Sequence, residues 1–378
     1  MFRARLHRRQ WLRQALALAG AAALPARART GFEPRLRLLA YGSLPPVGLR
    51  VDGVPIGGLS GLAWDAHTDL WYALSDDRGR HGPVRCHVLR LPGLAQGQAL
   101  VPEWLQTITL QDASGRPFAR GAVDPEGLAL RRDTATGSAT LLWCSEGDIR
   151  RRIAPAIYES ALDGRLLREL PLPPLLREIG APGRGPRNND TLEGVALTPD
   201  GRHLWAAMEG ALAQDAPAGL APDAPHPCRL TRFDWASGRP ERQVAYRPEP
   251  LPADPLMPQG PRVNGIADLL VAGDERLWVL ERAFSPTSGL SVRLYEAELR
   301  GATDTLAIDS LRRTRHTPVH KRLLLDLRQA GLPALDNLEA MAWGPAGPNG
   351  RPTLVLASDD NFNPLQITQF IAFEVTNG

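Results

Sequence analysis

Carboxylate side chains recur beside short apolar runs along this sequence of 378 residues. An aspartate or glutamate directly follows each of five such runs, and a second glutamate opens three of the runs that precede them. We list the acids that follow a run and then those that open one: Asp76, Asp77, Glu146, Glu209, Glu281, Asp359 and Asp360; Glu126, Glu193 and Glu339. If the fold brings these positions together, their mutual repulsion raises the carboxyl pKa values unless a cation is bound.

Oxygen-rich clusters of this kind suit Ca²⁺, and Mg²⁺ less well because it demands stricter octahedral geometry. We therefore predict a calcium-type site, in which bound metal would polarise an ester oxygen and lower the pKa of a coordinated water. The predicted metal ligands are Asp76, Asp77, Glu126, Glu146, Glu209, Glu339, Asp359 and Asp360.

Arginines and amides stand beside these acids. The planar guanidinium of arginine grips phosphate or carboxylate with two hydrogen bonds, and amides orient a ligand. We predict catalytic roles for Glu193, Glu281, Arg282 and Arg78, and ligand-binding roles for Asn189, Asn264, Arg187 and Asn361. The alternative is structural: acids at strand ends also bind backbone N–H groups, and adjacent arginines pair with them.

Several established chemistries have no matching motif in the sequence. There is no G-x-S-x-G, and the closest stretch, Gly58-Leu59-Ser60-Gly61, lacks the spacing of a nucleophile elbow. There is also no H-E-x-x-H, Walker A loop or Rossmann fingerprint, and the histidines lack metal-ligand spacing. We therefore expect no nucleotide or organic cofactor.

An internal repeat must position the acids. An apolar hairpin recurs around positions 61, 127, 194, 267 and 340, at intervals of 66 to 73 residues. Turn formers such as Pro199-Asp200-Gly201 separate its two runs, and two more polar strand candidates usually follow. Four antiparallel strands per unit, radially repeated, indicate an all-β propeller. A β-sandwich, the alternative fold, would not explain the regular recurrence.

We predict five blades, with six as the alternative because residues 284–336 are long enough to hold further strands. The last unit offers only three strands, so a strand at 35–40 is expected to supply the fourth and close the ring. Equivalent positions in a propeller lie at similar heights around one axis. The repeated acids should therefore converge on one mouth of the central channel.

The first 28 residues contain six arginines and no acid. They include a short apolar run, which is followed by Ala26-Arg27-Ala28. This order is typical of an export signal, and Arg8-Arg9 with the residues that follow resembles a twin-arginine signal. We expect residues 1–28 to be the signal and 29–378 a single domain that is periplasmic or secreted. The partner expected for the precursor is the twin-arginine export machinery, with an ordinary export signal as the alternative.

The formal net charge of +3 comes from a chain with 44 Lys and Arg, of which Lys321 is the sole lysine. Without the first 28 residues the remainder is mildly acidic, which argues against a nucleic-acid partner. No further segment is apolar enough to span a membrane. We expect a monomer. Three cysteines leave at least one thiol unpaired, and a Cys86–Cys228 bridge is possible in an oxidising compartment.

Five motifs occur in the order found in one family. They are Ser75–Gly79, Asp124–Gly127, Asn189–Gly194, Leu280–Phe284 and Ser358–Phe362. Over residues 35–375 the chain resembles the phytase-like domain family, described as having esterase-like activity of phytase. The resemblance implies an exported propeller that hydrolyses a phosphoester or carboxylester. Two alternatives remain: a non-catalytic propeller that binds a ligand or protein, and a lactonase-type propeller enzyme. The expected substrate is a small anionic or ester molecule.

Overall fold

The computed structural model describes residues 34–44, 48–216, 226–251 and 262–377. Short apolar runs become paired strands, and β-strands with tight turns make up nearly all of the regular structure. The predicted export signal at residues 1–28 lies outside the described residues. Within the described part, no helix is long and apolar enough to cross a membrane.

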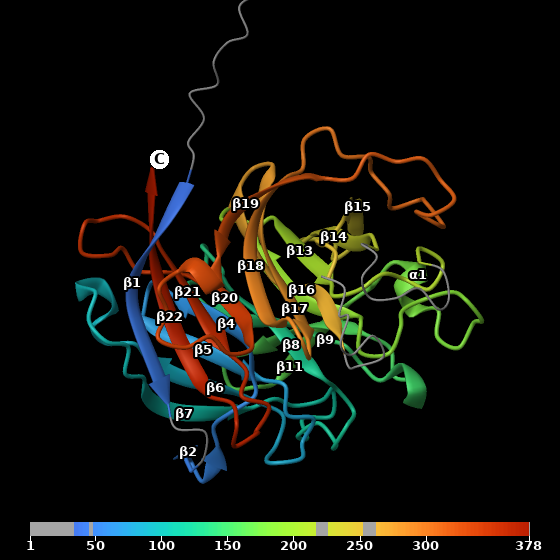
Figure 1. Cartoon of the computed structure of the whole chain (residues 1–378). Helices are drawn as coiled ribbons and strands as arrows, with labels where there is room; N and C mark the ends of the chain where they lie inside the picture. The colour runs from blue at the N-terminus through green and yellow to red at the C-terminus, as the bar shows by residue number, and fades with distance from the viewer. Residues whose placement is uncertain (1–33, 45–47, 217–225, 252–261, 378) are drawn as a thin grey trace, which may run out of the picture. The chain divides into compact units, whose positions relative to one another are not determined.

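Five four-stranded sheets, here called blades 1 to 5, account for most of the strands (Figure 1). Blade 1 contains β4 (Leu59–Asp65), β5 (Leu70–Ser75), β6 (Arg85–Arg90) and β7 (Glu103–Thr109). Blade 2 contains β8 (Pro125–Arg132), β9 (Ala139–Ser145), β10 (Ala156–Ala161) and β11 (Leu166–Leu170). Blade 3 contains β12 (Leu192–Leu197), β13 (His203–Met208), β14 (Cys228–Asp234) and β15 (Pro240–Tyr246).

Blades 4 and 5 complete the ring. Blade 4 contains β16 (Val263–Gly273), β17 (Arg276–Ser285), β18 (Gly289–Glu298) and β19 (His320–Asp326). Blade 5 has the order β1-β22-β21-β20, with β1 (Pro34–Leu44), β20 (Leu338–Gly344), β21 (Thr353–Ser358) and β22 (Thr368–Asn377). The N-terminal strand β1 lies beside β22, as Figure 1 shows. The predicted closure by terminal strands and the count of five blades are confirmed.

The remaining elements are small. They are the ribbon β2 (Arg50–Val51) and β3 (Val54–Pro55), the 3-10 turns η1 (Leu94–Gln96), η2 (Ile149–Arg151) and η3 (Leu327–Gln329), and the single-turn helix α1 (Pro174–Arg177). The stretch that left room for a sixth blade holds the outer strands β18 and β19 of blade 4.

The inner strands pack against one another around the ring in the order β4, β8, β12, β16 and β20, and β20 packs against β4. One hydrophobic cluster fills each of the five blade-to-blade interfaces. Alternate residues of a strand face opposite neighbours: in β9, Leu142 packs towards blade 3 while Trp143 packs towards blade 1. These strands are therefore apolar on both faces, and each buried Leu contributes roughly 1.5–3 kcal/mol relative to an exposed one.

The three cysteines, all in the described part, are buried and free. Cys86 lies in the interface between blades 1 and 2, and Cys228 lies between blades 3 and 4. Burial raises the pKa of all three thiols, so they pack as small apolar groups.

Candidate functional site

A bulge occurs at the same place in the first strand of every blade. The pairing skips one residue between Leu192 and Gly194 in blade 3, and it does the same at the matching position of blades 1, 4 and 5. In blade 2 it resumes only at Leu128, so Glu126 and Gly127 lie opposite the single residue Cys144. The bulged residues are Ser60, Glu126, Glu193, Ala267 and Glu339. A bulge re-aims its side chain and is common beside active sites. In three of the five blades the bulged residue is a glutamate, which is left out of the regular pairing between the first two strands.

A second set of side chains follows the second strand of each blade. The backbone N–H of Glu146 donates to the carbonyl oxygen of Asp124 at 2.9 Å, and Asp76, Glu209 and Asp359 make the same bond in their blades. In blade 4 the equivalent residue is Arg282, which lies within the longer strand β17. It pairs with Gly265, two residues before the bulged Ala267. We call Asp76, Glu146, Glu209, Arg282 and Asp359 the strand-end set.

Close approach of the inner strands brings the two sets together. A Cβ on Gly127 would lie 2.6 Å from the Cα of Gly194, so neither strand has room for a side chain there. The bulged acids Glu126 and Glu193 adjoin these glycines. Ser60 ties blade 1 to the same point by donating to the carbonyl oxygens of Pro125 and Glu126, each at 3.1 Å.

The result is a cavity of about 1060 Å³ at the end of the ring where the bulges lie. All but two of the predicted site residues line it. The lining residues among them are Asp76, Asp77, Arg78, Glu126, Glu146, Arg187, Asn189, Glu193, Asn264, Glu209, Arg282, Glu339, Asp359 and Asn361. These acids are buried except Asp76, which is partly exposed; Glu146 is 3% and Glu193 6% exposed.

The two exceptions are Glu281 and Asp360. Glu281 lies between the outer strands of blades 3 and 4, where its carboxylate accepts from the hydroxyl of Tyr246 at 2.6 Å and pairs with Lys321. Asp360 accepts from the backbone N–H groups of Gly58 and Phe362 and from the hydroxyl of Thr368. Both acids therefore hold the structure together beside the cavity.

Asp77 lines the cavity but is also fully engaged. Its carboxylate pairs with the buried Arg85 at 2.7 Å and accepts from the backbone N–H groups of Arg80 and His81. Asp77 therefore fits the structural alternative, in which an acid at a strand end binds backbone N–H groups and pairs with an arginine.

Two arginines compensate part of the acid charge. Arg282 pairs with Glu339, lies 3.3 Å from Glu209 and 3.8 Å from Glu193, and donates to the side-chain oxygen of Asn337 at 2.7 Å. Arg78 pairs with Asp124 and donates to Asn189 at 3.3 Å. With Arg80, Arg187 and Arg262, five arginines line the cavity in all, and the carboxylates outnumber them about twofold.

The uncompensated charge raises the carboxyl pKa values. Burial, reinforced by the charge of Glu209, raises the pKa of Glu146 to about 9. Burial also raises the pKa of Glu209 to about 7, although Arg282 opposes the rise. Burial and then the charges of Glu209 and Glu146 raise the pKa of Glu193 well above its usual range. Without a further cation, these carboxyls resist ionisation.

Two overlapping groups of buried acids have the spacing of a metal site. In Asp124–Glu126–Glu146 and in Glu146–Glu193–Glu209, one ligand oxygen from each residue lies within 4.8 Å of the others. Opposite ligands of Ca²⁺ stand about 4.6–5.2 Å apart. The buried oxygen Oε2 of Glu193 has no hydrogen-bond partner in the described part of the chain. These observations fit a bound cation.

Sequence reasoning missed several polar residues of this cavity, among them Asp124, Asp190 and Asn337. Asp124 and Asn337 each stand two residues before a bulged glutamate, and that shared spacing is the signal that could have identified them. Burial raises the pKa of Asp124 to about 6, and it raises that of Asp190 to about 6 as well.

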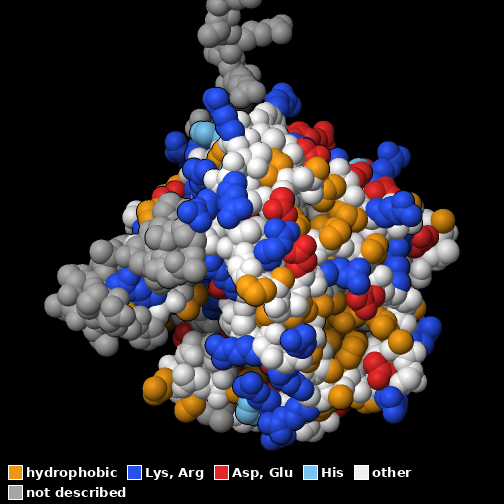
Figure 2. All heavy atoms as spheres, turned by 90° about the vertical axis from the view of Figure 1, so that its right-hand side faces the viewer, with side chains coloured by type: hydrophobic (Ala, Val, Ile, Leu, Met, Phe, Trp, Pro, Cys, Tyr) orange, Lys and Arg blue, Asp and Glu red, His pale blue; other side chains and the backbone are white. Residues whose placement is uncertain are grey.

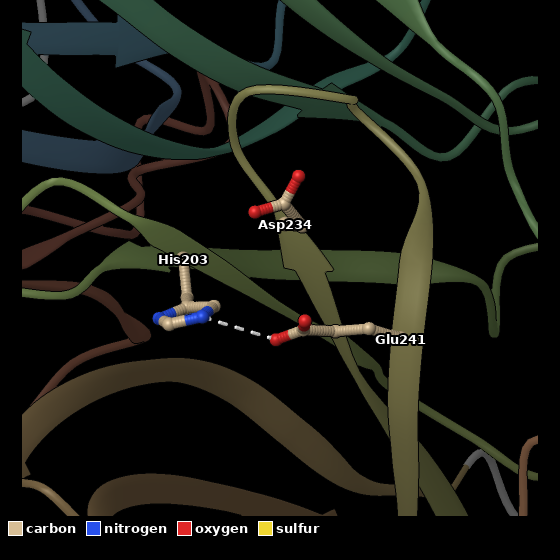
Figure 3. A group of neighbouring side chains, drawn as sticks. All are labelled: His203, Asp234 and Glu241. Atoms are coloured by element: carbon tan, nitrogen blue, oxygen red, sulfur yellow. Dashed lines mark ion pairs between the residues drawn. The ribbon is translucent and has the colours of Figure 1, made fainter.

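A separate group, His203, Asp234 and Glu241, also has metal-ligand spacing. Figure 3 shows its three side chains on adjacent strands of blade 3, with His203 and Glu241 3.2 Å apart. Arg232 pairs with Glu241 at 2.6 Å, and Asp234 accepts from Ser237 in its own turn. His203 begins β13 whereas Glu209 follows its end, so the group lies at the other end of the strand from the cavity.

Known structures align with this chain only at low identity and low TM-score. A thermostable family-43 glycoside hydrolase is 10% identical, with 87% of this chain and 92% of that chain covered and a TM-score of 0.46. The catalytic domain of the Coprinopsis cinerea GH62 α-L-arabinofuranosidase is 8% identical, with 90% and 97% covered and a TM-score of 0.42. Kuenenia stuttgartiensis hydrazine synthase is 13% identical, with 81% of this chain and 66% of that chain covered and a TM-score of 0.36.

These TM-scores all lie below 0.5, so the fold assignment rests on the chain's own sheets. No curated protein matches the sequence. A family model does match, over residues 54–362, and that range contains all five bulges and all five strand-end residues. The chain therefore belongs to the phytase-like family, described as having esterase-like activity of phytase.

Proposed function

We propose that the protein is an exported hydrolase that cleaves a phosphoester or carboxylester in the acid-lined cavity with the help of a bound Ca²⁺. The observation that carries the proposal is the pair of overlapping buried acid groups with the unpartnered Oε2 of Glu193. A cluster of this charge is costly without a cation, because like charges and burial both oppose ionisation. Membership of the phytase-like family supports the ester chemistry.

The cation would be held by Glu146, Glu193 and Glu209, whose oxygens lie within 4.8 Å of one another. Asp124 and Glu126 form the overlapping group with Glu146 and would hold a cation displaced towards blade 2. When bound, it would supply Lewis-acid polarisation of an ester oxygen and a water of lowered pKa.

The chain's own groups would do the remaining work. Asn189 receives a hydrogen bond from Arg78, so both are held where a substrate oxygen could meet them. Arg282 fixes Glu209 and Glu339 in place and adds positive charge where negative charge develops on a reacting ester.

The test is metal analysis followed by hydrolysis assays. Chelator-treated protein should bind Ca²⁺ in calorimetry and gain thermal stability from it. It should then hydrolyse a chromogenic phosphate monoester or carboxylic ester more than 100-fold faster with Ca²⁺ than without. Glu193→Gln should abolish both effects, while Glu281→Gln, outside the cavity, should retain metal binding. Hydrolysis that is equal in wild type and Glu193→Gln would contradict the proposal.

A non-catalytic binding propeller is the second candidate. It is favoured by Arg282, which already neutralises part of the carboxylate charge from within the chain. Ca²⁺ binding without turnover of either ester class would support this role.

A further inference from the structure

A second pocket of about 330 Å³ adjoins the acid cavity and has the opposite charge. It is lined by Arg78, Arg80, Arg120, Arg151, Gly121 and Asp148, and it shares Arg78 and Arg80 with the cavity. Arginines are spread over the face seen in Figure 2, so a single surface arginine carries little information. Four arginines around one pocket, opposed by one aspartate, are a different case because their charges repel.

Two of these arginines are only weakly compensated, and the charge of Arg80 acts on Asp124 at longer range. In the described part of the chain, the side chains of Arg80 and Arg120 make no hydrogen bond or ion pair. Arg78 is committed to Asp124 and Asn189. The carboxylate of Asp148 accepts from the backbone N–H of Arg151 as the cap of η2. The pocket therefore keeps a surplus of positive charge.

The loops that carry the arginines are joined by the backbone of Gly121. Its N–H donates to the carbonyl oxygen of Arg78 at 2.7 Å, and its carbonyl oxygen accepts from Arg151 at 2.7 Å. Gly79 has φ 77°, and a Cβ there would lie 3.1 Å from the Cα of Arg120. The loops after β5, β7 and β9 thus form one preorganised wall, which lowers the entropic cost of binding.

We propose that this pocket is an oxyanion site that binds the phosphate group of a substrate whose ester bond reaches the acid cavity. The surplus of charge favours a dianion over a carboxylate, and the guanidinium fork matches phosphate oxygens. The two pockets meet at Arg78 and Arg80, so one molecule can place its anionic end in the arginine pocket and its ester in the acid cavity. Only this assignment to a substrate rests on the proposed function; the anion site itself does not.

The first experiment is calorimetric titration of the full chain with inorganic phosphate, in the presence of chelator so that metal does not bridge the anion. The variant pair Arg80→Ala/Arg120→Ala should weaken phosphate binding at least tenfold, with thermal stability within a few degrees of wild type because neither side chain makes a hydrogen bond or ion pair in the described part of the chain. Arg116→Ala is the matched control: it removes an exposed arginine on the loop that carries Arg120, and its affinity should stay within twofold of wild type. Equal losses in both variants, or no phosphate binding by wild type, would overturn the site.

Acetate and sulfate identify the anion class. Sulfate should compete with phosphate, and acetate should bind at least tenfold more weakly. Acetate binding as tight as phosphate would refute the phosphate assignment. Arg120→Lys keeps the charge without the fork, and we expect an intermediate affinity.

The second experiment separates this inference from the proposed function. Glu193→Gln should retain phosphate affinity while losing Ca²⁺ binding. In esterase assays, Arg80→Ala/Arg120→Ala should raise KM at least fivefold for a phosphorylated ester and leave KM for a neutral ester unchanged. Wild type that binds phosphate but hydrolyses neither ester contradicts the proposed function alone. An equal rise in KM for both esters contradicts the substrate assignment.

Discussion

Blades 2 and 4 carry side chains of opposite charge at equivalent positions of the strand-end set. In blade 2, Glu146 follows β9 and faces the cavity, where burial raises its pKa. In blade 4, Arg282 occupies that position, and Glu281 one residue earlier turns away from the cavity towards Lys321 and Tyr246. An acid that meets a cation within the chain is held as an ion pair, whereas an acid left among other acids resists ionisation, which is why we propose a cation there.

The largest expected effect on stability comes from breaking the ion pair between Lys321 and Glu281 in blade 4. Lys321→Met leaves Glu281, at 4% exposure, as a buried charge without its cation. We expect the free energy of unfolding to fall by about 3–5 kcal/mol, measured by chemical denaturation. Lys321→Met/Glu281→Leu should recover most of the loss. A cost below about 1 kcal/mol for the single variant would contradict the ion-pair interpretation.

The next largest effect is expected from removing one of the buried acids that blades 2 and 3 contribute to the cavity. Glu193→Gln removes a carboxyl whose ionisation the folded chain opposes, so the chelator-treated protein should become more thermally stable than wild type. The same change should lower Ca²⁺ affinity about 100-fold, as loss of groups around a metal can do. Thermal melting and calorimetry check the two signs. A variant that is less stable without Ca²⁺ would show that Glu193 is a structural acid.

The pH dependence of stability sharpens the comparison further. The raised pKa values of Glu146, about 9, and Glu209, about 7, mean that the folded chain holds protons that the unfolded chain has lost. Between pH 4.5 and these values, stability in chelator should therefore fall as pH rises, by about 1.4 kcal/mol per unit for each group. Denaturation at several pH values tests this slope, and Ca²⁺ should flatten it. A slope of opposite sign would rule out the raised pKa values.

The smallest effect concerns two adjacent acids of blade 5. Asp360 accepts two backbone N–H groups and a hydroxyl, whereas Asp359 lies in the strand-end set. Asp360→Asn should destabilise the protein by about 1–2 kcal/mol. Asp359→Asn should be neutral or stabilising in chelator, because burial and the charge of Glu339 raise the pKa of Asp359. Similar losses in both variants would remove the distinction between the two acids.

The sequence alone was enough to predict the blades because each blade repeats the same apolar hairpin and turn residues. It also located the cavity, since equivalent positions of a ring share one height. The difference between Glu281 and Arg282 could not be predicted, because in blade 4 the residue after the bulge is Asp268, one position later than the repeat spacing suggested. That offset turns Arg282 inward, and a one-residue shift exchanges the faces of a strand. The partners of Glu281, Lys321 and Tyr246, come from distant outer strands that carry no motif.

Blade 5 combines the first and last strands of the described chain, and an ion pair between Arg37 and Glu374 joins them. This closure has a kinetic consequence. The contact spans almost the whole sequence, and contacts of such separation slow folding because the loop must be ordered before they form. Until β22 arrives, β1 has no neighbour in its sheet, and the interfaces of blade 5 with blades 1 and 4 lack Phe370 and Phe373. We therefore expect the hairpin β20–β21, which carries Glu339 and precedes Asp359, to be locked in place only when the two ends of the chain have met.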